Sequence, residues 1–197
     1  MWLTTLYHDY RVIQEVLKLH TPYVYPFYNS SSGQRLINLL ILAEDHRNRF
    51  HIGFDVIAIF RACYRRMTSS NLEGASTIEQ QLVRVITGDY RRTLYRKLKE
   101  IIMAVCIRKN HNRRILAIIY LDIAYYGTYY QSLDEILGKY GLSKLDEIDL
   151  QTCASIIARL KYPEPRKHSQ KRLSQINARS LHILKLYQLY QKKQRIL

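Results

Sequence analysis

Turn-forming residues are scarce in this chain of 197 residues, which contains only seven glycines and four prolines. Between them, apolar residues recur three and four positions apart, which is the period of an α-helix that buries one face. No pair of alternating apolar segments flanks an Asn-Gly or Asp-Gly turn, so the sequence does not predict a β-hairpin. We therefore expect an all-α fold.

A hydrophobic content of 47% in a chain of this length is enough for one sizeable core. We expect one main domain over residues 34–165. It is preceded by an amphipathic helix and a linker over residues 1–33, where the sequence NSSSG ends the first helix. It is followed by a basic helix over residues 166–197.

A formal net charge of +15 favours an anionic partner: nucleic acid, a lipid headgroup or a phosphate-bearing substrate. Charged residues interrupt every apolar stretch before it reaches about 18 residues, so neither a signal peptide nor a membrane span is predicted. Any membrane contact would then be peripheral. Cys63, Cys106 and Cys153 lack the spacing of a zinc site or a disulfide framework, and we expect ordinary buried thiols.

The segment AEDHRNRFHIGFD, residues 43–55, places Glu44 and Asp45 directly after an apolar run. A helix over that run would be apolar on nearly all sides and would end at Glu44, so it is predicted to be buried. A carboxylate in such surroundings suits a general acid or base. The alternative is a solvated Glu44 paired with Arg47 or Arg49, a common and weak surface arrangement.

The segment EGASTIEQQLVR, residues 73–84, contains a helix start. Ser76 and Glu79 have the spacing of a capping box, and the backbone amides at such a start can bind anions. A capping box alone says nothing about chemistry, because every helix needs a start. Three further polar residues extend the strip over the next turns: Gln80, Gln81 and Arg84.

The segment RRTLYRKLKEIIMAV, residues 91–105, is predicted to be an amphipathic helix. Its charged side is formed by Arg92, Arg96, Lys99 and Glu100, and its apolar side by Leu94, Leu98, Ile101, Ile102 and Val105. Packing the apolar side on the core would leave three cations and one carboxylate facing outward. Such a face is either a solvated surface with i, i+4 pairs or a clamp for a pyrophosphate.

The three segments together resemble the peptidoglycan glycosyltransferases, glycosyltransferase family 51. The first family motif, Glu-Asp-x5-His-x-Gly-(Phe/Val)-Asp, is met by Glu44, Asp45, His51, Gly53, Phe54 and Asp55, and Arg61 with Ala62 follows. The second, Gln-Gly-Gly-Ser-Thr-Ile-Thr-Gln-Gln with a Lys three residues later, is similar to residues 73–81 with Arg84. The third, Arg-(Ser/Thr)-x-x-Arg-Lys-x-x-Glu, is matched by Arg92, Thr93, Arg96, Lys97 and Glu100.

Later segments continue the resemblance more weakly, with YLDIAYYG at 120–127 and DLQTCASIIARLKYP at 149–163, so that it covers roughly residues 36–185. Six positions depart from the family pattern: Asn48 for Phe, Ala75 for Gly, Glu79 for Thr, Arg84 for Lys, Ile118 for Glu and Asp122 for Asn. Both glutamates of the family site are kept. The resemblance therefore implies a divergent member with an altered substrate or a reduced rate.

The resemblance implies an enzyme that joins lipid-linked disaccharides, in which an acceptor hydroxyl attacks C1 of a donor held by polyprenyl pyrophosphate. Glu44 and Glu100 are the expected catalytic residues, with Glu44 as the base and Glu100 on the donor side. The expected substrate-binding residues are Asp45, Arg61, Ser76, Thr77, Gln80, Gln81, Arg84, Arg92, Arg96 and Lys99. Of these, Arg84, Arg92 and Lys99 would neutralise the pyrophosphate.

The implied fold is the lysozyme-like helical one, with a small jaw over about residues 56–72 that touches the bilayer. The resemblance also implies a peripheral location at the outer face of the bacterial cytoplasmic membrane, on an anionic surface. Neither the family's membrane anchor nor a transpeptidase domain is visible, so we expect a membrane-anchored partner. The basic helix at 166–197 would either lie on anionic lipid or pack on the domain.

Two other functions stay open at this point. A lysozyme-like lytic enzyme would use one acidic glutamate on finished glycan, but it has no need for the cations. A non-catalytic basic module would bind membrane or nucleic acid, and the motifs make nucleic acid the less favoured partner. No cofactor is predicted with certainty and no protein metal site is predicted. A Mg²⁺ or Mn²⁺ ion at the pyrophosphate fits the resemblance, and Asp45 or Glu79 could assist it.

Overall fold

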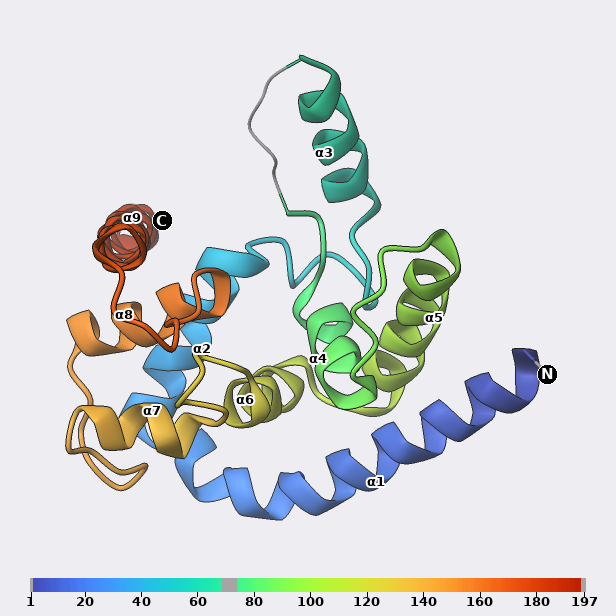
Figure 1. Cartoon of the computed structure of the whole chain (residues 1–197), viewed down its shortest axis with the longest axis horizontal. Coiled ribbons are helices and arrows are strands. Elements are labelled where there is room, and N and C mark those ends of the chain that lie inside the picture. Colours follow the sequence, from blue (N-terminus) through green and yellow to red (C-terminus); the bar gives the residue numbers. More distant parts are fainter. Residues whose placement is uncertain (1, 69–73, 196–197) are drawn as a thin grey trace. The chain divides into compact units, whose positions relative to one another are not determined.

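The computed structural model describes residues 2–68 and 74–195, and every regular element in this part of the chain is an α-helix (Figure 1). The helices are α1 (Trp2–Tyr28), α2 (Ser31–Glu44), α3 (Val56–Thr68), α4 (Ile78–Thr87), α5 (Leu94–Asn110), α6 (Arg113–Ile123), α7 (Leu133–Lys139), α8 (Leu150–Lys161) and α9 (Gln170–Arg195). The all-α prediction is confirmed. Residues 69–73, which include the end of the predicted jaw and Glu73, lie outside the described residues.

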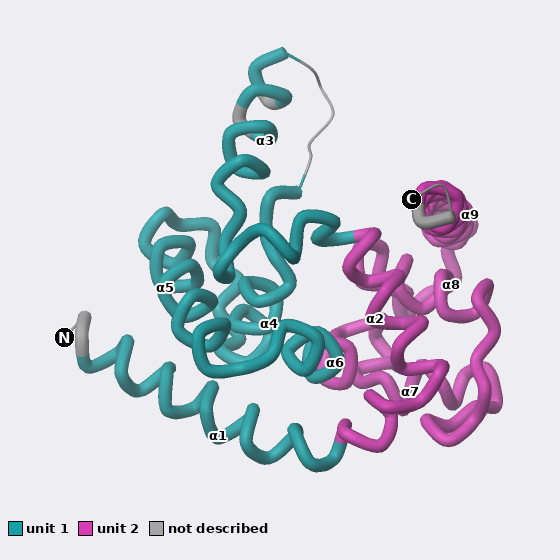
Figure 2. Tube along the Cα trace, turned by 180° about the vertical axis from the view of Figure 1, so that it is seen from behind, with its two compact units in different colours: residues 1–23, 44–120 teal, residues 24–43, 121–197 magenta. Residues whose placement is uncertain are grey.

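The helices group into two compact units, each built from separate stretches of sequence (Figure 2). Unit 1 contains residues 1–23 and 44–120, and unit 2 contains residues 24–43 and 121–197. The division into segments 1–33, 34–165 and 166–197 stays a prediction. From Glu44 onward, the residues of all three motif segments belong to unit 1.

In unit 1, α4 packs against α5 (Figure 1). Thr77 caps the start of α4, where its side chain accepts a hydrogen bond from Gln80 N, and Gly88 ends the helix with a φ of 61°. Gly53 has a φ of 111°, and a Cβ there would lie 2.6 Å from the carbonyl oxygen of Ala104. Glycine thus lets the loop between α2 and α3 pass closely over α5.

The first turns of α5 bury the side that the sequence pattern assigns to solvent. Lys99 and Glu100 are 6% and 2% exposed, whereas Leu94 is 91% and Leu98 is 52% exposed. The expected outward orientation is therefore wrong for Lys99 and Glu100, whereas Arg92 is exposed. The charges can be buried because they pair with one another and with α1 and α4, and the apolar core contacts of α5 begin farther along, at Met103.

In unit 2, α8 packs against α9, and Ile176, Ser180 and Ile183 of α9 are buried. The C-terminal helix is thus a packed element on one face, as one of the two sequence interpretations expects. Cys153 lies in this core, and burial raises the pKa of its thiol to about 12. Cys106 is half-buried, and the Cys63 side chain is outside the described structure.

Candidate active site

Glu44 is the last residue of α2, and the start of unit 1's second segment. Its Oε2 lies 3.5 Å from Nε2 of Gln81 on α4, and Gln81 Oε1 accepts a hydrogen bond of 2.7 Å from the hydroxyl of Tyr120 on α6. Burial and the charge of Glu44 raise the pKa of Tyr120, so this hydroxyl stays a donor. Arg47 is one of the two arginines that the surface alternative pairs with Glu44. In the structure it forms an ion pair with Asp55 at 2.9 Å.

A small pocket in unit 1 has Glu44 in its wall. The other lining residues come from the loop after α2, from α3 and from the segment before α4: Asp45, His46, Asp55, Ala58, Arg61, Gly74, Ala75, Ser76 and Thr77. Five of the expected site residues therefore share one pocket. It is formed where the first and second sequence motifs meet.

Glu100 is the centre of a cluster of cations. Arg84 donates to both carboxylate oxygens, Nε to Oε2 and a terminal nitrogen to Oε1, each at 3.0 Å. Lys97 Nζ donates to Oε1 at 2.7 Å, and Arg96 donates to Oε2. Burial alone would raise the pKa of Glu100, but the hydrogen bonds from Arg84 and Lys97 outweigh it, and the pKa lies below its ordinary value.

Ser76 connects this cluster with the pocket that contains Glu44. Its hydroxyl oxygen lies 3.0 Å from Lys97 Nζ and 3.3 Å from a terminal nitrogen of Arg84. Lys97 also donates to Gln80 Oε1 at 2.7 Å. Because α4 carries Gln80, Gln81 and Arg84 on its first turns, one helix contacts both glutamates.

The sequence of this chain also matches a known protein family. The family model described as Transglycosylase matches residues 16–188. The chain belongs to the transglycosylase family. Its similarity to penicillin-binding protein 1A of Aquifex aeolicus is 28% identity over 148 residues, 73% of this chain and 20% of that protein. The monofunctional glycosyltransferase of Staphylococcus saprophyticus is 30% identical over 100 residues, 51% of this chain and 37% of that protein.

Penicillin-binding protein 1F of Bacillus subtilis is 32% identical over 114 residues, which are 57% of this chain and 16% of that protein. The chain thus spans well under half the length of these curated relatives. The family membership agrees with the lysozyme-like all-α fold expected from the motifs.

Two of the three residues expected to neutralise the pyrophosphate are not among the cations that donate to Glu100. One of them, Lys99, does line a small pocket together with Arg84, Arg96 and Glu100. Lys99 Nζ contacts Asp9 of α1 at 2.6 Å and lies 3.8 Å from Asp89. Arg92 is exposed in the segment before α5. In place of Lys99, the cluster contains Lys97, which is part of the third motif and three residues before Glu100, a spacing that could have identified it.

Asp45 and Thr77 are buried and form hydrogen bonds with the backbone next to the site. Asp45 is 6% exposed, and its Oδ2 accepts a hydrogen bond of 3.2 Å from the backbone of Ile78. Thr77 is 2% exposed and donates to the Gly53 carbonyl oxygen at 2.7 Å. Asp45, His51 and Glu79 also form a group whose ligand atoms could hold a metal ion.

Proposed function

We propose that this chain polymerises a polyprenyl-pyrophosphate-linked saccharide of the lipid II type, with inversion at C1 and release of polyprenyl pyrophosphate. The observation that carries the proposal is the position of Ser76, which lines the pocket of Glu44 and contacts two cations of the Glu100 cluster. A base and a site for a diphosphate are thereby adjacent. Membership of the transglycosylase family and the names of the relatives support the same activity.

In this proposal, Glu44 takes the proton from the 4-hydroxyl of the acceptor sugar. The hydroxyl oxygen then forms the new bond to C1 of the donor, on the face opposite to the pyrophosphate. The bond between C1 and the pyrophosphate oxygen breaks, and its electron pair leaves with the pyrophosphate. Gln81, held by Tyr120, keeps the Glu44 carboxylate directed toward α4.

Arg84, Arg96 and Lys97 would stabilise the negative charge on the departing diphosphate. Three cations around a single carboxylate leave a net positive charge, and guanidinium groups bind phosphate oxygens through two parallel hydrogen bonds. Glu100 holds these cations in place before the substrate arrives. Burial is the main cause that lowers the pKa of Lys97, and the hydrogen bond and charge of Glu100 oppose it.

Arg92 and Arg61 would complete the substrate contacts at the edges of the site. Arg92 is exposed beside the first turn of α5, and Arg61 lines the Glu44 pocket from α3. Ser76, Gln80 and Gln81 would hydrogen-bond the sugar or phosphate at the start of α4. Lys99 would act indirectly, by tying α5 to Asp9 of α1.

The residues around Glu100 do not fit a Mg²⁺ or Mn²⁺ ion at the pyrophosphate. The two carboxylate oxygens of Glu100 already accept hydrogen bonds from three cationic side chains. A divalent ion would have to approach Glu100 through that positive charge. No step of the proposed reaction therefore involves a metal.

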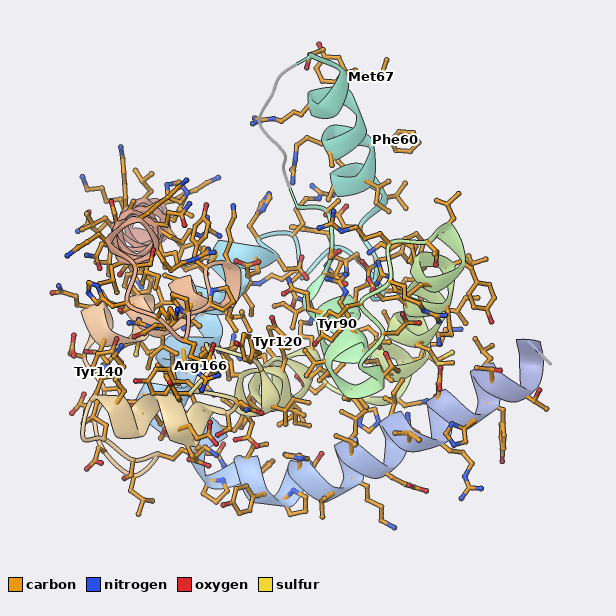
Figure 3. The ribbon with its side chains drawn as sticks, viewed as in Figure 1. Phe60, Met67, Tyr90, Tyr120, Tyr140 and Arg166 are labelled. Atoms are coloured by element: carbon orange, nitrogen blue, oxygen red, sulfur yellow. The ribbon has the colours of Figure 1, made fainter. Side chains whose placement is uncertain are left out.

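We also propose a peripheral position on an anionic membrane, at the outer face of the bacterial cytoplasmic membrane, with a membrane-anchored partner. None of the described helices has the length and apolarity to cross a bilayer. Phe60 and Met67 project from α3, and they are 71% and 87% exposed (Figure 3). Such exposed apolar side chains near basic ones suit the lipid interface.

The test is turnover of labelled lipid II in the presence of anionic vesicles. We expect Glu44→Gln to lower the rate by about 10²–10⁴-fold, because the amide cannot accept the proton. Glu147→Gln is a matched control, since that side chain is 75% exposed in unit 2. Unchanged turnover in Glu44→Gln would refute its role as the base, and muropeptide release from sacculi without polymer would replace the proposal with a lytic function.

A further inference from the structure

Two carboxylates and a histidine meet in the interior of unit 1, next to the pocket of Glu44, whose wall includes Asp45. One ligand atom from each of Asp45, His51 and Glu79 lies within 4.8 Å of the others. The side chains of Asp45 and His51 are each 4% exposed, and Glu79 is 1% exposed. Two neighbouring carboxylates are costly to bury unless a cation or protons neutralise them.

Asn48 provides a second observation at the same place. It is 1% exposed, and its Nδ2 lies 3.2 Å from Asp45 Oδ2 and 3.5 Å from Glu79 Oε1. Within the described residues, neither Asn48 Oδ1 nor Glu79 Oε2 has a hydrogen-bond partner. Buried polar atoms without a hydrogen-bond partner are rare in folded proteins. A half-turn of the Asn48 side-chain amide would exchange Nδ2 and Oδ1, so that Oδ1 would face both carboxylates.

Arg108 forms only a long ion pair with Glu79. Arg108 Nε is 3.9 Å from Glu79 Oε1, beyond hydrogen-bonding distance, and this Nε is itself buried without a partner among the described residues. The charge of Glu79 is thus only partly compensated by the protein. A small cation between the carboxylates would compensate it directly.

We propose that Asp45, Asn48, His51 and Glu79 bind one Zn²⁺ ion. Two carboxylate oxygens, one amide oxygen and His51 Nε2 make a closed four-ligand set with one nitrogen, which suits Zn²⁺ better than Mg²⁺, an ion that keeps water ligands. Ligands of a tetrahedral Zn²⁺ at about 2.0 Å lie roughly 3.3 Å apart. His51 Nε2 already lies 2.9 Å and 3.1 Å from the two oxygens of Asp45, so this pair needs only a small shift. The Glu79 oxygen, within 4.8 Å of both, has to move closer.

Besides the half-turn of the Asn48 amide, zinc binding requires a local rearrangement at His51. The backbone N–H of Gly53 now donates to His51 Nδ1 at 3.2 Å. When Nε2 binds the metal, the ring proton resides on Nδ1, so this hydrogen bond opens. The backbone amide of Gly53 is therefore a reporter of the metal.

The site joins the loop that follows Glu44 to the second residue of α4. An ion there would fix the distance between the base and the helix that carries Ser76 and Gln80. The sequence departs from the family pattern at both Asn48 and Glu79, and the structure places these two departures in contact. The site is thus a property of this chain, and it does not depend on sugar transfer.

The test is calorimetric titration of chelator-treated protein with ZnCl₂, without lipid, together with thermal unfolding. We expect one ion per chain and a higher unfolding temperature. Glu79→Gln should weaken binding at least 100-fold, and so should the double change Asn48→Phe with Glu79→Thr, which restores the residue types of the family. Glu147→Gln should bind as the unchanged protein does.

Co²⁺ substitutes for Zn²⁺ as a spectroscopic probe, and we expect the visible absorption of a four-coordinate ion. Absence of stoichiometric Zn²⁺ binding to the unchanged chain would overturn the proposal, whether or not the variants fold. Equal binding by Glu79→Gln would also overturn it. Polymerisation of lipid II is measured separately, so failure of either proposal leaves the other intact.

Discussion

Two lysines of α5, two residues apart in the sequence, have different surroundings although their side chains are of the same type. Lys97 donates to Ser76, Gln80 and Glu100, whereas Lys99 is buried and pairs with Asp9. A step of two residues turns an α-helix by about 200°, so the two side chains face different elements. Their substitutions should therefore affect different properties.

We predict that Lys97→Met lowers the turnover of folded protein by at least about tenfold, because it removes one charge from the proposed leaving-group site. Asp9→Asn should instead reduce the free energy of unfolding by about 2–4 kcal/mol, since it leaves Lys99 buried without its closest partner. Turnover per folded molecule and urea unfolding separate the two effects. Comparable turnover losses in both variants would contradict this assignment.

The ionisation of Glu100 gives a second prediction. Its pKa in the folded protein lies below its ordinary value of 4.5, so the ionised form stabilises the fold. This contribution is complete above the unfolded-state pKa and is lost as the pH falls through the folded-state pKa. Glu100→Gln should be less stable than the unchanged chain by about 2–3 kcal/mol at neutral pH, and the difference should shrink below about pH 4.5. A pH-independent difference in urea unfolding would count against it.

The sequence motifs identify both glutamates, Arg84 and the polar start of α4. They could not predict the ion pair between Lys99 and Asp9, because Asp9 is 90 residues away in the chain and belongs to no motif. They also treated Asn48 and Glu79 as separate departures, since a contact across 31 residues leaves no local pattern. Side-chain partners across elements are what the sequence cannot supply.

At the scale of elements, α5 shows how a correct helix can be given the wrong buried face. Periodicity locates the helix, but it orients the helix by assuming that apolar residues face the core. Here the pairing of Glu100 with three cations makes the charged side the buried one. Leu94 and Leu98 are consequently left exposed, and large exposed apolar side chains indicate a contact surface.

We predict that Leu94→Ser with Leu98→Ser weakens binding to anionic vesicles by at least about tenfold, because each leucine that enters lipid contributes about 1.5–3 kcal/mol when fully buried. Stability should change by less than about 0.5 kcal/mol per substitution at these exposed positions. Leu145→Ser is the matched control, since Leu145 is 94% exposed in unit 2. Vesicle co-sedimentation measures the effect, and equal losses in the control would remove the special role of α5.

At the scale of the whole molecule, composition and periodicity were sufficient for the all-α class, and the ordered motifs for the family. They were not sufficient for the two units. Residues 24–43 separate the two parts of unit 1, and residues 44–120 separate the two parts of unit 2. Such grouping depends on contacts between distant segments, for which the chain offers no local signal.

The net charge of +15 gives the last prediction, which concerns the electrostatic part of membrane binding. Each basic residue near an anionic surface contributes about 1 kcal/mol, and the Debye length falls from about 10 Å at 0.1 M salt to about 3 Å at 1 M. Binding to anionic vesicles should therefore weaken steeply over this range of salt. Binding to zwitterionic vesicles should be weak and nearly independent of salt, because the exposed apolar side chains alone supply it. Co-sedimentation with both vesicle types measures the difference, and salt-independent binding to the anionic vesicles would show that the charge does not direct the chain to the membrane.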